Sequence, residues 1–98
     1  MKILITNTFK RAAKKLHKNQ VAILKDAIKT ISTNPAIGEL KVGDLVGVRV
    51  YKFHIHHQLI LLAYSYKEKL EEITLLSFSS HENFYRKLKV QLESNSIS

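Results

Sequence analysis

The sequence contains no cysteine, which excludes disulfide bonds, thiolate metal ligands and a cysteine nucleophile. Its glycines, at positions 38, 43 and 47, do not form the glycine-rich loop that holds phosphate groups in nucleotide-binding proteins. No apolar run approaches the roughly 18 residues that a membrane span needs. The apolar stretch within residues 1–6 is too short for a signal peptide. We therefore expect a cytoplasmic protein that does not enter a membrane.

The length of 98 residues leaves room for one domain. A chain of this size buries only one modest core, so we expect no large cofactor. The sequence predicts a single domain over residues 1–92, followed by a polar tail at 93–98.

Acidic residues are scarce: 8 Asp and Glu stand against 16 Lys and Arg, for a net charge of +8. Such an excess favours a polyanionic partner, which can be nucleic acid, an acidic membrane surface or an acidic protein. Taken singly, each lysine is an ordinary solvated side chain. The early cluster and a second one near the C-terminus are together better explained by attraction to phosphate. The predicted RNA-binding residues are Lys10, Arg11, Lys14, Lys15, Lys18 and Arg86.

The N-terminal half has the pattern of a strand followed by two helices. Residues 2–6 are rich in β-branched residues and predict an opening or edge strand. Thr8 is the expected N-cap of the first helix and Asn19 that of the second. The second helix should end near Thr33, because Pro35 disfavours a helical conformation in the residue before it. The apolar positions at helical spacing are Phe9, Ala12, Ala13 and Leu16, then Val21, Leu24, Ala27, Ile28 and Ile31.

The C-terminal half has the period of strands. Residues 40–44 predict a turn or short strand, and 45–55 a long strand. Residues 59–66 are nearly all apolar, as expected of a central strand covered on both faces. A charged loop at 67–71 leads to a last strand at 73–78, so the three consecutive strands should form an antiparallel meander.

A short C-terminal helix should follow the meander, because Ser79 and Glu82 have the spacing of a capping box. The predicted fold class is therefore α+β. Its order is an N-terminal strand, a two-helix hairpin, a β-meander that brings the sheet to about four strands, and the C-terminal helix.

The long strand carries the first candidate site. Strand alternation places Lys52, His54 and His56 on one face. The other face then holds Arg49 with two aromatic residues. Three cationic or titratable groups in a row repel one another unless an anion lies among them, and RNA phosphates would meet that need. The alternative is a solvated face beside a turn, above all for His56 and His57.

The second candidate site is the start of the C-terminal helix. His81 and Tyr85 are four residues apart and so share one helix face. The positive end of the helix dipole disfavours a protonated imidazole at His81, and a neutral imidazole is a competent general base. Tyr85 offers a hydroxyl for a phosphate or a ring for stacking on a base. The alternative is that His81 only caps the helix and Tyr85 only packs.

RNA is the substrate that suits these residue types, because its own 2′-hydroxyl is the nucleophile. The protein then needs a base, cations for the phosphate and an acid for the leaving oxygen. A zinc site of His54, His56, His57 and His81 is an alternative that we do not favour. We expect no metal and no cofactor.

Several segments resemble the RelE/ParE superfamily of bacterial toxins. Residues 41–53 (KVGDLVGVRVYKF) and 61–64 (LLAY) are similar to its middle strands. Residues 80–89 (SHENFYRKLK) are similar to the C-terminal signature of its ParE-like branch. The resemblance implies a four-stranded antiparallel sheet with two N-terminal helices, and a toxin encoded with a small antitoxin.

The family also implies activities and residue roles. RelE-like members cut mRNA in the ribosomal A site, whereas ParE members poison DNA gyrase. By position, Lys52 and His54 match strand residues that contact RNA, and His81 and Tyr85 match a catalytic histidine and aromatic residue. Two arginines of the family have no counterpart in this sequence. The position of the first lies in the apolar run around Leu61, and the position of the second is occupied by serine. Arg49 or Arg86 would have to replace them.

Three functions follow as hypotheses. The first is a type II toxin that acts as a ribosome-dependent, metal-independent mRNA endonuclease, with His81, Tyr85, Lys52, His54 and Arg49 as catalytic residues. The second is a non-enzymatic gyrase inhibitor that needs no catalytic histidine. The third is a member without toxicity that serves as its antitoxin's partner. For either toxin we expect an antitoxin that covers the two helices and the open face of the sheet, because a protein of charge +8 attracts an anionic cover.

Overall fold

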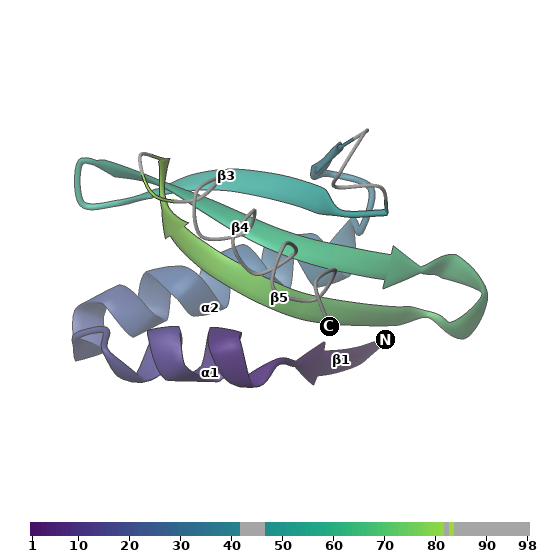
Figure 1. The fold of residues 1–98 in the computed structure, drawn as a ribbon, viewed down its shortest axis with the longest axis horizontal. Coiled ribbons are helices and arrows are strands. Elements are labelled where there is room, and N and C mark those ends of the chain that lie inside the picture. Colours follow the sequence, from purple (N-terminus) through teal and green to yellow (C-terminus); the bar gives the residue numbers. More distant parts are fainter. Residues whose placement is uncertain (42–46, 82, 84–98) are drawn as a thin grey trace, which may run out of the picture.

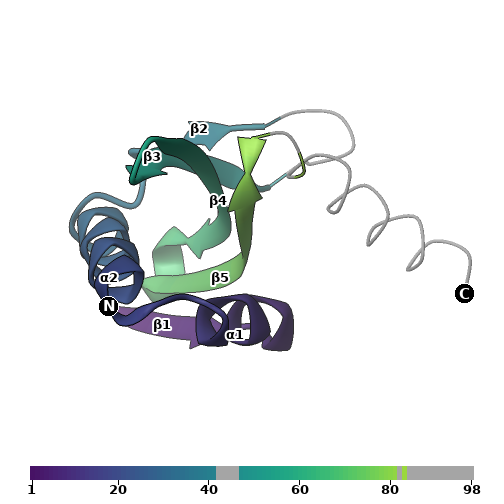
Figure 2. The same ribbon diagram turned by 90° about the vertical axis from the view of Figure 1, so that its left-hand side faces the viewer.

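A five-stranded sheet with two helices makes up the residues that the computed structural model describes, which are 1–41, 47–81 and 83. In chain order the elements are β1 (Lys2–Ile5), α1 (Asn7–Lys14), α2 (Lys18–Thr33), β2 (Glu39–Leu40), β3 (Arg49–Ile55), β4 (Gln58–Lys67), a 3-10 turn (Glu68–Leu70) and β5 (Glu72–Ser80). Figure 1 shows α1 below β5 and α2 behind the sheet, and Figure 2 shows α2 on the concave side of the sheet. None of the helices in this part of the chain is long and apolar enough to cross a membrane.

Both helices begin two residues earlier than the sequence pattern predicted. The N-cap of α1 is Thr6, not Thr8, and that of α2 is His17, not Asn19. Thr6 Oγ1 accepts a hydrogen bond from the backbone N–H of Phe9 at 3.1 Å and donates one to the Leu76 carbonyl at 2.6 Å. This cap is therefore selected by a contact with β5, which the local pattern does not contain. The end of α2 at Thr33 confirms the prediction made from the proline that follows.

The predicted antiparallel meander is confirmed. The strand order is β1-β5-β4-β3-β2, with β4 antiparallel to both of its neighbours. β1 lies at one edge, as expected, and pairs in parallel with β5. The predicted count of about four strands omitted β2, whose two residues pair only with Val50 and Arg49 at the other edge.

Two predicted boundaries in the second half are wrong. The long strand does not start at 45, because Gly47 has a left-handed φ of 83° and β3 begins at Arg49; residues 45 and 46 lie outside the described residues. Ser79 is not a helix cap, because β5 continues to Ser80 and Ser79 pairs with Leu61. His81 and Asn83 have helical backbone, and the rest of the predicted helix, with the boundary at 92 and the tail, lies outside the described residues.

The central strand β4 is the most buried part of the sheet, as its apolar sequence predicted. Its residues from Leu61 to Tyr64 are all 0% exposed. One face of the sheet packs against both helices, in a core that consists of Phe9, Leu24, Ile31, Ile55, Ile60, Leu62, Tyr64, Ile73, Leu75 and Phe78. The ring of Phe9 in α1 meets that of Phe78 in β5 edge to face, with centroids 5.0 Å apart.

Tyr64 connects this core to the segment between α2 and β2. Its hydroxyl donates a hydrogen bond to the Pro35 carbonyl at 2.7 Å and accepts one from the Gly38 N–H at 2.9 Å. A Cβ at position 38 would lie 2.6 Å from the Tyr64 hydroxyl oxygen, so only glycine allows this approach. The buried phenol thus positions the chain that leads into β2.

Replacement of Tyr64 by Phe should lower the free energy of unfolding by about 1–3 kcal/mol, because the buried Gly38 N–H loses its acceptor. Urea denaturation measures this loss. The matched control is Tyr66→Phe in the same strand, because the Tyr66 hydroxyl forms no hydrogen bond with the described residues. A loss of equal size in both variants would contradict the role given to Tyr64.

Stability should also fall in alkaline solution through Tyr64. Burial raises the pKa of this phenol above 10.0, while the Gly38 N–H and the Arg49 charge oppose the rise. A raised pKa means that the folded state retains the proton more firmly than the unfolded state. Its contribution is complete below pH 10 and is lost as the pH rises through the folded-state pKa. The Tyr64→Phe variant should therefore lose less stability than the wild type between pH 9 and 11 in denaturation series.

Candidate functional site

The sheet face turned away from α1 and α2, called the outer face below, carries the strand residues singled out from the sequence. Lys52 and His54 lie on it, in alternation with Tyr51 and Phe53, which pack toward the helix side. The middle of the outer face is apolar, and its buried cluster consists of Val50, Leu61 and Ala63. At the β3 margin of this cluster, Lys52 and His54 are exposed.

Strand register shows what lies beside these two side chains. Lys52 pairs with Leu61, and Leu61 pairs with Ser79, so the three form one row across the outer face. His54 pairs with Leu59 in the next row, toward the end of the sheet. Paired residues have their Cβ atoms about 5 Å apart on the same face. Lys52 and Ser79, two strands apart, are therefore separated by about 10 Å.

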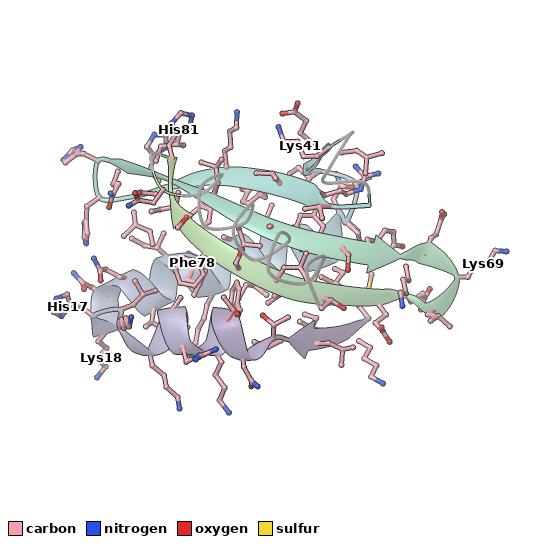
Figure 3. All side chains as sticks on the ribbon, in the orientation of Figure 1. His17, Lys18, Lys41, Lys69, Phe78 and His81 are labelled. Carbon is pink, nitrogen blue, oxygen red and sulfur yellow. The ribbon has the colours of Figure 1, made fainter. Side chains whose placement is uncertain are left out.

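His81 lies at the same end of the sheet, directly after β5 (Figure 3). With Ser80 and three residues of the β3–β4 hairpin it lines an open depression of about 370 Å³. The hairpin residues in its wall are His57, Gln58 and Leu59. The fold thus brings His54 of β3 and His81, which follows β5 and lies 27 positions later in the sequence, to the same end of the sheet, with β4 between their strands.

The hairpin turn has a strained backbone at His56, where φ is 49°. A left-handed conformation costs a non-glycine residue about 1 kcal/mol or more. The His56 Nε2 atom lies 3.5 Å from the Asn19 Nδ2 atom of α2. Histidine is among the residues that tolerate this region best, and such strain is concentrated at functional sites. His56 therefore belongs to the turn that shapes the site, and its side chain faces α2.

Arg49 is not brought together with the other predicted catalytic residues. It lies five residues from His54 along β3, a distance of about 17 Å. Its guanidinium donates to the carbonyl of Gly38 at 2.9 Å and to that of Ala36 at 3.4 Å, beside Tyr64. Its observed contacts hold the α2–β2 connection in place, so we leave it out of the candidate catalytic group.

The predicted RNA-binding cluster lies on the other side of the molecule from Lys52 and His54. All its members in the described residues are exposed, and they are Lys10, Arg11, Lys14, Lys15 and Lys18. They belong to α1, to the connection that follows it and, for Lys18, to the first residue of α2. α1 packs on the helix side of the sheet through Phe9. Figure 3 shows His17 and Lys18 at the same end of the molecule as His81. Tyr85 and Arg86 lie outside the described residues.

No three His, Asp or Glu residues within 1–41, 47–81 and 83 are arranged to hold a metal ion. The four histidines considered from the sequence do not form a zinc site in this structure. What the depression does contain are an amide at Gln58 and a hydroxyl at Ser80, which the sequence analysis did not single out. The hairpin register could have revealed them, since it places the start of β4 opposite the end of β5.

Comparison with known proteins assigns the family. Residues 3–89 match the family model of the ParE-like toxins of type II bacterial toxin–antitoxin systems. No curated protein sequence matches the chain.

Solved structures with the same fold include RelE toxins and their complexes. A chain of the RelBE2 toxin–antitoxin complex from Mycobacterium tuberculosis is 18% identical, with a TM-score of 0.69 over 82% of this chain and 96% of that chain. The isolated E. coli RelE toxin is 15% identical, with a TM-score of 0.63 over 90% of this chain and 95% of that chain. A chain of the archaeal RelE–RelB complex from Pyrococcus horikoshii is 16% identical. Its TM-score is 0.58, over 81% of this chain and 92% of that chain. Identities this low establish the shared fold, whereas the family model spans almost the whole chain. The chain belongs to the ParE-like toxins of type II bacterial toxin–antitoxin systems.

Proposed function

We propose that this toxin is an endoribonuclease that cuts mRNA on the ribosome. The observation that carries the proposal is that Lys52 and His54 share the outer face, and that His54 lies toward the end of the sheet at which His81 lines an open depression. The two imidazoles and the ammonium group, from β3 and from the residue after β5, are of the kinds that RNA cleavage requires. The family resemblance supports the same reading, because RelE-like members cut mRNA.

The chemistry of such a cut is balanced without a further reactant. One imidazole removes the proton of the 2′-hydroxyl, and the 2′-oxygen attacks the adjacent phosphorus. The bond from phosphorus to the 5′-oxygen breaks, and another side chain, acting as a general acid, gives that oxygen a proton. The products are a 2′,3′-cyclic phosphate and a 5′-hydroxyl. Lys52 would stabilise the charge that develops on the non-bridging oxygens.

The assignment of roles follows position. His81, beside the depression, is the proposed base or acid, and His54 is its partner across Leu59. Tyr85, four residues beyond His81, keeps the role predicted from the sequence, as a stacking ring or a proton donor. The predicted RNA-binding cluster, on the opposite side of the sheet, would bind RNA phosphates away from the cleavage site.

His81→Ala should lower the rate of mRNA cleavage on purified ribosomes by about 10²–10⁴-fold, because general acid–base catalysis contributes that much. Lys52→Ala should cost about 10²–10³-fold, as removal of one charge-stabilising donor does in other enzymes. Single-turnover cleavage of a defined mRNA measures both effects.

The matched control is Lys69→Ala, which changes the same residue type as Lys52→Ala at the far end of the sheet (Figure 3). This variant should cleave at the wild-type rate. Wild-type activity in the His81 variant with unchanged Tm would remove His81 from the mechanism.

A gyrase inhibitor is the second candidate, favoured by the ParE-like family model. The two functions separate in a brief induction in growing cells. Immediate arrest of amino-acid incorporation with cuts inside coding sequences supports the ribonuclease. Continued translation with accumulating DNA breaks, retained in a His81→Ala, Lys52→Ala double variant, supports gyrase inhibition.

We also propose that a cognate antitoxin covers the basic surface, as the solved RelBE complexes suggest for this fold. Attraction to a toxin of charge +8 weakens as salt screens it. The complex purified from co-expression should therefore dissociate faster as salt is raised. A Lys10→Ala, Lys14→Ala variant should show a smaller salt dependence. Dissociation that is insensitive to salt would contradict the electrostatic part of this proposal.

A further inference from the structure

The depression at the end of the sheet is large enough to hold one nucleobase. Its volume of about 370 Å³ falls in the range of roughly 300–1,000 Å³ that small-ligand sites span. Two separate segments form its wall: the β3–β4 hairpin through His57, Gln58 and Leu59, and the end of β5 through Ser80 and His81. Because it is open to solvent, a group on a longer polymer can enter it.

The wall combines the groups that recognise an unstacked base. His57 and His81 offer planar rings for stacking, and Leu59 adds an apolar surface. Gln58 offers an amide with both a donor and an acceptor, and Ser80 a hydroxyl. Proteins that read single-stranded RNA stack the splayed base on rings and form hydrogen bonds with its edge.

The position of the depression suits a base next to the reacting phosphate. Leu59 in its wall is the strand partner of His54, and His81 belongs both to the wall and to the proposed catalytic group. A nucleotide whose phosphate lies beside Lys52 and His54 would thus have its base at this end of the sheet.

We propose that the depression binds one base of the mRNA at the cleavage site, and that Gln58 makes adenine the preferred base. A carboxamide forms two hydrogen bonds with adenine, accepting from N6 and donating to a ring nitrogen. The two imidazole rings also favour a purine, which offers the larger surface for stacking. This inference rests on the proposed ribonuclease function and assigns its sequence preference to one side chain.

The test is a map of cleavage sites made by sequencing the 5′-hydroxyl ends after incubation with ribosomes and a pool of mRNAs. Wild-type cuts should share adenine at one fixed position. In Gln58→Glu the carboxylate only accepts hydrogen bonds and suits the N4 amino group of cytosine. Adenine preference should fall by about five- to 150-fold in this variant, and cytosine should rise at the same position. Asn7→Asp, the same change of charge at the exposed start of α1, should leave the map unchanged.

The outcomes separate the two proposals. Cuts at the same sequences in the wild type and in Gln58→Glu would overturn the role of Gln58 while the ribonuclease function stands. If the wild type makes no cuts, the ribonuclease function fails. Titration of the purified toxin with adenosine monophosphate then decides whether the depression binds a base. Chemical-shift changes at the amides of Gln58 and Ser80 that vanish in Gln58→Glu would support base binding. Their absence would overturn it.

Discussion

Burial of β4 on both faces is the constraint on which the rest of the structure depends. Its four central residues, Leu61 to Tyr64, lose all exposure to solvent, and their side chains alternate between the helix core and the apolar cluster of the outer face. A strand buried in this way must satisfy its backbone polar groups, so β3 and β5 pair along it on either side. The buried Tyr64 hydroxyl also needs hydrogen-bond partners, and it finds them in the Pro35 carbonyl and the Gly38 N–H.

The candidate site is a consequence of that pairing. Side chains alternate with a period of two, so a register slip of one residue would turn Lys52 and His54 into the helix core and expose Tyr51 and Phe53. The two-residue hairpin between β3 and β4 prevents such a slip, at the cost of a left-handed His56. The same hairpin supplies three of the residues that line the depression. Backbone strain in the turn and the geometry of the site thus have one origin.

The positive charge is distributed over both sides of the sheet. One exposed basic cluster extends from α1 to the first residue of α2, and the β3 margin of the outer face carries Lys52 and His54. Charges of this kind attract phosphate without regard to sequence. Discrimination between RNA sequences therefore requires groups that contact base edges, and in our proposal Gln58 is that group.

The sequence by itself determined the features that arise from local physics. The helix stripes, the stop before Pro35 and the apolar run of β4 predicted two helices and an antiparallel meander, and alternation in β3 placed Lys52 and His54 together. Only the tertiary structure decided which threonine caps α1, since Leu76 in β5 is 70 residues away from Thr6. It also decided that Ser79 continues a strand and that Arg49 is bound to backbone carbonyls. Likewise, the depression around Gln58 exists only because the start of β4 lies beside the end of β5. Patterns along the chain report which face a residue occupies, whereas the partner that a polar group finds depends on contacts between distant segments.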